Sequence, residues 1–251
     1  MILYFSGTGN SKHVAEYIKR RTGEELISIA DCCNSRHFSF RLKKGERLGF
    51  VFPVYYWGIP SIVEEFVKYA RIETYGKNYT YCVATCGATT GGADVALSRL
   101  LKKKNLSLNA SFAVKMVDNY TITFDVKDKI KNREINLAAE DELKEVSELI
   151  LKKQSGNYNK IRGVWPAYPL THAVYNATRF TLPFKASADC ISCGKCVREC
   201  PTRTIALECG KPVWTNARCS LCLSCLHNCP VNAITYGPTS KKNGQYHYEE
   251  M

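Results

Sequence analysis

The chain opens with Ile2-Leu-Tyr-Phe-Ser-Gly-Thr-Gly-Asn-Ser11, which passes from an apolar run into a turn rich in glycine and hydroxyl side chains. Val14, Tyr17 and Ile18 then recur at helical spacing until Gly23. The stretch therefore predicts a buried strand, a turn and a helix. In such a unit the backbone N–H groups and the dipole of the helix face the turn, and small side chains let an anion approach closely. This opening predicts an α/β domain with an anion site at its first turn.

Three nucleotide-binding loops share this general shape, and their spacings separate them. Walker A needs four residues between its first glycine and Gly-Lys-Ser/Thr, which this loop lacks. The dinucleotide pattern G-x-G-x-x-G starts with Gly7 and Gly9 but meets Lys12 where the third glycine belongs. The remaining pattern resembles the phosphate loop of flavodoxins, in which hydroxyls and amides surround the FMN phosphate. This resemblance implies that Gly7 allows the turn and that the phosphate ligands are Ser6, Thr8, Gly9, Asn10 and Ser11.

Residues 1–155 continue with alternating strand and helix patterns. The expected strands are Leu26–Ala30, Arg47–Phe52, Tyr79–Thr85 and Ser111–Val117, and the expected helices after the first are Ser61–Tyr69, Ala93–Lys103 and Glu140–Lys152. With the opening strand this makes five strands, and the alternation predicts a doubly wound parallel sheet. We therefore expect a flavodoxin-like FMN-binding domain over residues 1–155, with ligands at the carboxyl ends of its strands.

Two further loops follow expected strands. They run from Pro53 to Pro60 and from Thr85 to Gly92, and the corresponding loops of flavodoxins flank the isoalloxazine ring. The expected cofactor-binding residues are Tyr55, Tyr56, Trp57 and Gly58 in the first loop and Thr85, Cys86, Gly87 and Gly91 in the second. The alternative for the aromatic residues is a place in the domain core, since tyrosine and tryptophan bury large areas anywhere.

Two copies of one cysteine pattern lie near the C-terminus. The first runs Cys190-x2-Cys193-x2-Cys196-x3-Cys200-Pro201 and the second Cys219-x2-Cys222-x2-Cys225-x3-Cys229-Pro230. This is the bacterial iron–sulfur spacing, in which the fourth cysteine of each run ligates the other cluster. One 4Fe–4S cluster is therefore expected on Cys190, Cys193, Cys196 and Cys229, and a second on Cys219, Cys222, Cys225 and Cys200. Zinc sites are the alternative, but they usually present two separated C-x2-C pairs.

The cysteine-rich segment, residues 186–237, resembles a bacterial-type two-cluster ferredoxin, which implies a small α+β domain. The first run has Gly194 after its second cysteine, whereas the second run has Leu223 there. His227 lies between ligands of the second run, where it either hydrogen-bonds a cluster sulfur or is a surface or packing residue. Residues 156–185 contain six aromatic residues, so this connecting segment is expected to pack between the domains. The C-terminal tail, residues 238–251, is expected to dock or to fray.

Composition restricts the class of protein. The 251 residues are 45% hydrophobic, and no apolar run approaches the roughly 18 residues that span a membrane. We expect a cytoplasmic protein, in which thirteen cysteines indicate metal ligands and free thiols rather than disulfides, and an anaerobic or reducing setting. The net charge is +12, and residues 149–188 contain no acidic residue. This acid-free stretch favours a docking face for an acidic redox partner; no nucleic-acid-binding motif accompanies the basic charge.

The whole chain resembles the flavodoxin–ferredoxin fusion proteins of anaerobic bacteria. The resemblance implies an electron-transfer iron–sulfur flavoprotein that passes electrons between two 4Fe–4S clusters and FMN. No nicotinamide-binding domain fits beside these parts, so we expect electrons to be exchanged with a protein partner such as a ferredoxin or an oxidoreductase. The alternative is a flavin-dependent reductase that acts directly on a quinone, a nitro compound or a similar small molecule. A metal-dependent nucleic-acid binder is a third, weaker hypothesis. The sequence predicts neither the direction of electron flow nor the oligomeric state.

Overall fold

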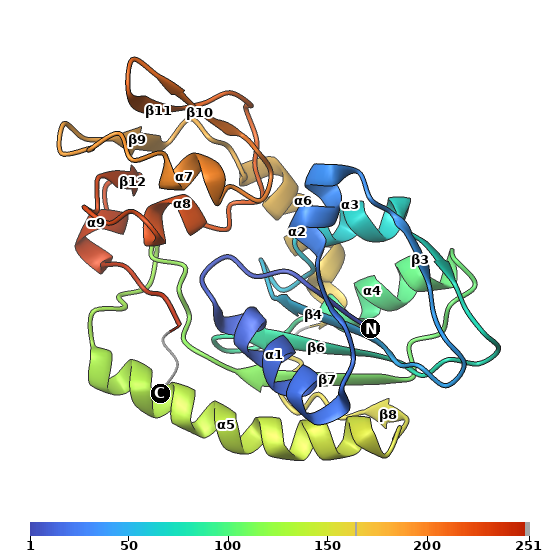
Figure 1. The fold of residues 1–251 in the computed structure, drawn as a ribbon. Helices are drawn as coiled ribbons and strands as arrows, with labels where there is room; N and C mark the ends of the chain where they lie inside the picture. The colour runs from blue at the N-terminus through green and yellow to red at the C-terminus, as the bar shows by residue number, and fades with distance from the viewer. Residues whose placement is uncertain (164, 249–251) are drawn as a thin grey trace.

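The computed structural model describes residues 1–163 and 165–248, so the last three residues of the predicted tail lie outside it. Its larger unit is built on a six-stranded parallel sheet with the order β2-β1-β4-β6-β7-β8 (Figure 1). These strands are β1 (Ile2–Tyr4), β2 (Leu26–Ser28), β4 (Leu48–Pro53), β6 (Thr80–Cys86), β7 (Ala110–Lys115) and β8 (Gly156–Asn157). The chain runs outward in opposite directions from β1, so the topological switch point lies between β1 and β4.

The doubly wound parallel sheet is confirmed, but it has six strands rather than the five expected. The extra strand, β8, pairs with Ala110 and Ser111 of β7. Its two residues, Gly and Asn, carry no apolar pattern, so its extended form comes only from pairing with the free edge of β7. The strand expected to end at Ala30 ends at Ser28, because the Ser28 hydroxyl accepts the Asp31 N–H (3.2 Å) and caps the unexpected helix α2 (Ile29–Ser35).

Helices cover both faces of the sheet. One face is covered by α1 (Asn10–Thr22) and α5 (Lys129–Leu151), the other by α2, α3 (Ser61–Tyr69) and α4 (Ala93–Lys102). Because strand side chains alternate, Ile2 and Val51 pack with α1 and α5, whereas Leu3 and Phe50 pack with the other group. Helix α5 begins at Lys129, well before the expected Glu140, since the Asp128 side chain caps it by accepting the Lys131 N–H (3.0 Å). A short parallel pair, β3 (Ser39–Arg41) and β5 (Arg71–Glu73), lies beside the main sheet.

The smaller unit holds both cysteine runs. Its elements are β9 (Phe184–Ala186), α7 (Lys195–Arg198), β10 (Ile205–Glu208), β11 (Lys211–Trp214), α8 (Ser224–His227), β12 (Ile234–Tyr236) and α9 (Ser240–Asn243). Strands β9 and β12 pair antiparallel, as do β10 and β11. This matches the expected small α+β arrangement. Within residues 1–163 and 165–248, no helix combines the length and the apolar character needed to cross a bilayer.

The connecting segment forms a 3-10 turn (η1, Trp165–Ala167) followed by α6 (Tyr168–Thr178). Tyr175 of α6 is buried between the two units. Its hydroxyl donates to the backbone carbonyl of Ser220 (2.8 Å) and accepts the backbone N–H of Ser61 (3.3 Å). Its ring lies against Tyr55 and Tyr56, with centroids 6.3 and 5.5 Å away. One side chain of the connecting helix therefore joins the sheet unit to the second cysteine run.

Candidate functional site

A cavity of about 410 Å³ opens at the carboxyl edge of the main sheet. Four loops line it, and each follows a strand: β1, β4, β6 or β7. The carboxyl ends of parallel strands meet at one edge, which is where open α/β sheets bind ligands. Of the fourteen cofactor-binding residues expected from the sequence, eleven line this cavity: Ser6, Gly7, Thr8, Asn10, Ser11, Tyr55, Tyr56, Trp57, Thr85, Cys86 and Gly87.

The loop after β1 forms the narrow, polar part of this wall. Helix α1 starts at Asn10 without a side-chain cap and without an acidic residue in its first turn, so its first N–H groups can face an anion. The Asn10 side chain is already used: Nδ2 donates to the carbonyl of Val117 (3.1 Å), and Oδ1 accepts the hydroxyl of Tyr246 (2.8 Å). Asn10 therefore shapes the loop with its side chain and can offer an anion its backbone N–H.

Three expected glycines lie one layer behind the cavity. A Cβ on Gly9, whose φ is 102°, would lie 2.8 Å from Cβ of Tyr248. A Cβ on Gly58 would lie 2.5 Å from the Tyr168 ring, and a Cβ on Gly91 would lie 2.3 Å from Cβ of Trp57. Real Cβ atoms do not tolerate these separations. These glycines therefore let the loops pack tightly against other segments, and the structure gives them no place in the cavity wall.

The loop after β4 presents its aromatic side chains on a tight turn. Tyr55 and Gly58 exchange backbone hydrogen bonds (3.0 and 2.9 Å), and the residues between them, Tyr56 and Trp57, have φ of 48° and 59°. Left-handed backbone is strained for bulky residues and concentrates at functional sites. Tyr55 is packed among other aromatics, whereas Trp57 is exposed at the mouth of the cavity.

Sequence reasoning missed the loop after β7. Val117, Asp118, Asn119, Tyr120, Thr123 and Phe124 all line the cavity. Asp118 lies against Gly87, where a Cβ would come within 2.3 Å of Cβ of Asp118. Burial raises the pKa of the Asp118 carboxyl above its ordinary value. The rule that ligands bind at strand carboxyl ends applies to β7 as well, and it was the available signal; this loop lacks the glycines that drew attention to the other three.

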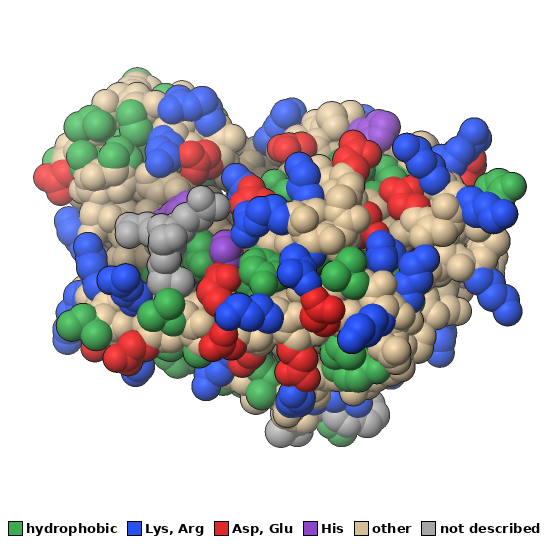
Figure 2. Space-filling model, turned by 60° about the horizontal axis from the view of Figure 1, so that its bottom comes forward, with side chains coloured by type: hydrophobic (Ala, Val, Ile, Leu, Met, Phe, Trp, Pro, Cys, Tyr) green, Lys and Arg blue, Asp and Glu red, His purple; other side chains and the backbone are tan. Residues whose placement is uncertain are grey.

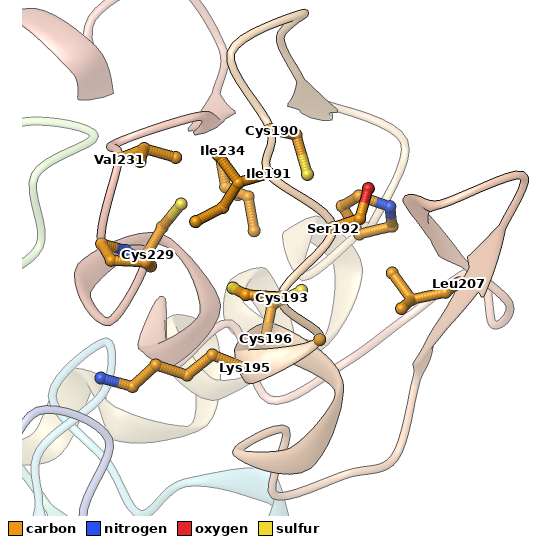
Figure 3. A pocket seen from close by; sticks show the side chains of 13 residues that line it. Cys190, Ile191, Ser192, Cys193, Lys195, Cys196, Leu207, Cys229, Val231 and Ile234 are labelled. Carbon is orange, nitrogen blue, oxygen red and sulfur yellow. The ribbon is translucent and has the colours of Figure 1, made fainter.

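Three cysteines of the first run and one cysteine of the second line a separate, much smaller cavity. Its four cysteines are Cys190, Cys193, Cys196 and Cys229, the set that ligand exchange predicts (Figure 3). Ile191, Val231 and Ile234 add apolar wall. The backbone N–H of Ala233 donates to Sγ of Cys229 (3.2 Å), a contact of the kind that tunes iron–sulfur clusters. We call this the outer cluster site.

The other four cysteines, Cys219, Cys222, Cys225 and Cys200, also lie near one another. Burial raises the pKa of Cys219 to about 11, and the nearby Cys200 raises it as well. Burial together with Cys222, Cys200 and Cys219 raises the pKa of Cys225 well above its ordinary value. Crowded and largely buried thiols become stable thiolates only beside a cationic centre, which releases their protons. We call this the inner cluster site.

Across the part of the chain that the structure describes, no three His, Cys, Asp or Glu side chains converge on a position for one ion. Zinc would bring its thiolates within about 2.3 Å of one point, whereas a cubane spreads its four thiolates over the corners of a larger body. The donor set of eight cysteines and the apolar walls fit iron–sulfur clusters.

The inner cluster site touches the large cavity. Leu221, Cys222 and Leu223 all line it, and a Cβ on Gly7 would lie 2.9 Å from the carbonyl oxygen of Cys222. His227 reinforces the contact: its Nε2 donates to the carbonyl of Asn119 (2.9 Å), and its Nδ1 accepts the N–H of Tyr246 (3.0 Å). Burial lowers the pKa of His227 to about 4, so the ring is neutral at pH 7. Of the sequence alternatives, His227 is a packing residue, and it is buried rather than on the surface.

The C-terminal tail docks across both units as far as the structure describes it. The Gln245 side chain donates to the carbonyls of Leu226 (2.6 Å) and Cys229 (2.9 Å). The Tyr248 N–H donates to the carbonyl of Thr8 (2.9 Å). The tail thus ties the second cysteine run to the loop after β1.

Comparisons with known proteins agree with this division. The family described as a flavodoxin domain matches residues 1–142, and the 4Fe-4S dicluster domain matches residues 189–234. Among solved structures, the Trp repressor binding protein from Bacillus subtilis is 15% identical with a TM-score of 0.35, covering 57% of this chain and 96% of its own. Rubredoxin oxygen:oxidoreductase from the anaerobe Desulfovibrio gigas is 14% identical with a TM-score of 0.34, covering 59% and 36%. No curated protein matches the chain.

Proposed function

Because the chain belongs to the flavodoxin domain family over residues 1–142 and carries a 4Fe-4S dicluster domain, it is an iron–sulfur flavoprotein of electron transfer, and we propose that it passes electrons between two 4Fe–4S clusters and one FMN. The observation that carries the proposal is the position of Cys222, an expected cluster ligand that lines the expected flavin cavity together with Leu221 and Leu223. Bound FMN exchanges electrons singly or in pairs, and a 4Fe–4S cluster exchanges them singly.

Different segments of the chain bind the phosphate, the ring and the two clusters. In this proposal the turn from Ser6 to Ser11 binds the phosphate through N–H and hydroxyl groups, and the Ser11 and Thr85 hydroxyls brace each other (2.7 Å). The loops after β4 and β6 hold the ring between Tyr55–Trp57 and Thr85–Gly87. The outer site holds one cluster on Cys190, Cys193, Cys196 and Cys229, and the inner site holds the other on Cys219, Cys222, Cys225 and Cys200. Electrons then pass from the outer site through the inner site to the flavin, or in reverse.

The first test is composition. Protein purified without oxygen should carry one FMN and about eight iron atoms per chain, with flavin bands and a broad iron–sulfur shoulder in its spectrum. On mixing with dithionite, both the shoulder and the flavin bands should bleach. Zinc-loaded protein without a yellow chromophore would contradict the proposal.

A second candidate function rests on the mouth of the cavity. Trp57 and Phe124 are both exposed and both line it, and an aromatic mouth suits a planar acceptor such as a quinone. Direct reduction of such a molecule at the flavin predicts turnover with NAD(P)H and a quinone or dye in the absence of any carrier protein. If no turnover occurs while a reduced carrier protein still delivers electrons to the flavin, the direct reductase function is excluded and the electron-transfer function remains.

A further inference from the structure

The two cluster sites differ in their access to solvent. At the inner site Cys200, Cys219 and Cys225 are buried and Cys222 faces the flavin cavity, whereas at the outer site Cys193 is exposed. Electron transfer between proteins requires the two redox centres to come close together. Given the proposed function, the outer site is therefore where a protein carrier can reach the chain of cofactors without displacing the flavin.

The outer site is surrounded by exposed apolar side chains. Ile191 is 60% exposed, Leu207 is 41% exposed and Val231 is 37% exposed, and all three line the outer cavity (Figure 3). We call these three residues the apolar rim. Large apolar side chains gathered around one opening, with charged residues beyond them, mark an interaction surface rather than ordinary scattered exposure. Three such side chains around one opening suit the small interfaces of transient redox complexes.

Two cationic side chains donate hydrogen bonds to backbone carbonyls of the loop that carries the outer cysteines. Lys211 Nζ donates to the carbonyls of Ala188 and Cys190 (both 3.1 Å), and Arg198 Nη1 donates to the carbonyl of Cys193 (3.0 Å). Lys195 lines the cavity itself. Residues 185–211 contain five basic and three acidic side chains. Of the three acids, Asp189 lies 3.6 Å from Lys241, Glu199 lies 3.9 Å from Lys195, and Glu208 is exposed.

The acid-free stretch from residue 149 to residue 188 offers less free charge than its sequence indicates. Lys160 pairs with Glu145 (3.2 Å) and Arg162 with Asp94 (3.3 Å), so residues outside the stretch supply the missing acids. Arg179 donates to the carbonyl of Cys219 (3.0 Å) at the inner site. Figure 2 shows basic and acidic side chains interspersed over the face that carries α5. Two of the six basic side chains of this stretch are therefore paired with acids from outside it.

We propose that the apolar rim, with Arg198 and Lys211 beside it, docks an acidic protein that carries one electron at a time. An occupied cluster site is itself anionic, so cations fixed beside it reduce the repulsion of an acidic partner and steer its approach. One electron then passes from the reduced centre of the partner to the outer site, which leaves the partner oxidised and the outer site reduced. The apolar rim excludes water where the two surfaces meet.

The experiment compares two variants that carry the same substitution. Leu207→Glu puts a negative charge on the apolar rim, whereas Leu137→Glu puts it on α5, where the leucine is 50% exposed. The probe is an acidic bacterial 4Fe–4S ferredoxin, photoreduced and mixed with the holoprotein at low ionic strength. We measure the second-order rate constant of reduction and, separately, the dissociation constant of the oxidised pair. Each variant is also reduced with dithionite, which needs no docking surface.

The L207E variant should react with the ferredoxin about tenfold more slowly and bind it more weakly, and L137E should match the wild type. The wild-type rate should fall as salt is added. Equal rates for the two variants, a rate that salt does not change, or no reduction of the wild type by ferredoxin would each overturn the docking proposal. Dithionite separates this failure from failure of the proposed function: if the function is wrong, dithionite leaves the wild type without cluster and flavin bleaching.

Discussion

The two cysteine runs have the same backbone conformation but different surroundings. Each ligand of the first run has its counterpart 29 positions later, as Cys190 and Cys219 show. The residues with positive φ correspond as well: Ser192 with Leu221 (57° and 50°), Gly194 with Leu223 (70° and 56°), and Arg203 with Asn232 (47° and 48°). The short helices α7 and α8 begin at equivalent positions. The ligand spacing thus imposes one backbone on both runs.

Side chains between the ligands decide which run faces the flavin cavity. The first run carries Ile191 and Ser192 on the exposed outer site, whereas in the second run Leu221 is 4% exposed and Leu223 is 2% exposed. Leu223 adopts the left-handed backbone that Gly194 takes without strain. The structure tolerates that strain because the leucine is buried in the cavity wall. The cysteine spacing therefore determines the backbone conformation of each run. The side chains between the cysteines determine whether the run faces solvent or the flavin cavity.

The largest effect is expected from removing one ligand in each run. Cys193→Ser and Cys222→Ser should each lower the iron content from about eight to about four atoms per chain. Only C222S should also weaken FMN binding, because Cys222 lines the flavin cavity and its carbonyl contacts the position of Gly7. Iron analysis and a flavin fluorescence titration measure the two effects. If both variants weaken FMN binding equally, the runs are not divided into outer and inner sites.

The second effect concerns the buried leucine. Leu223→Ala should lower the free energy of unfolding by about 2–4 kcal/mol, as buried leucine truncations do, whereas Leu207→Ala on the exposed rim should cost under about 1 kcal/mol. Anaerobic denaturation followed by circular dichroism measures both. Leu223→Gly tests the strain: it should destabilise no more than L223A, because glycine relieves the left-handed backbone. A larger loss in L223G would show that φ at this position stores no strain.

Much of this arrangement could be predicted before the structure was known. Short apolar runs that alternate with helical patterns predicted the doubly wound sheet, and three of the four cavity loops were predicted, namely the turn from Ser6 to Ser11 and the loops after β4 and β6. The cysteine spacing predicted the grouping that lines the outer cavity. These features are local: each depends on residues close together in sequence. Ligand spacing and strand patterns impose the same geometry wherever the segment lies.

The remaining features depend on contacts between distant segments. Strand β8 exists only because β7 offers a free edge, and Gly9 leaves the cavity wall because Tyr248 covers it. Which run would face the flavin could have been read from its apolar side chains: Leu221 and Leu223 stand where the first run has Ser192 and Gly194. The leucines can be assigned to the flavin cavity only once the structure shows that cavity next to them. From the sequence alone, an apolar residue in a cluster domain can equally cover the cluster itself.

The tail sharpens the comparison, because Gln245 binds carbonyls of the second run and Tyr246 reaches the loop after β1. Tyr246→Phe removes the donor to Asn10 Oδ1 (2.8 Å) and the acceptor of Asn136 Nδ2 (3.1 Å). Leaving these buried groups unpaired should cost about 1–2 kcal/mol in the free energy of unfolding and weaken FMN binding. Tyr236→Phe, which loses only an exposed bond to the carbonyl of Phe180 (3.2 Å), is the control. Equal FMN affinity in both variants would show that the tail does not support the phosphate loop.

The smallest effect compares two aspartates, one near each run. Asp118 lines the flavin cavity, and burial raises its pKa, whereas Asp189 is exposed and lies near Lys241. A carboxyl whose pKa is raised by folding stabilises the fold only while protonated, and that stability is lost as the pH rises through the folded-state pKa. Asp118→Asn should therefore stabilise the protein at pH 8, by under about 1 kcal/mol, and the gain should shrink as the pH falls toward the raised pKa. Asp189→Asn should show no such gain. Thermal unfolding at several pH values measures both, and a gain for D118N that does not change with pH would mean that the substitution acts through packing rather than through the charge.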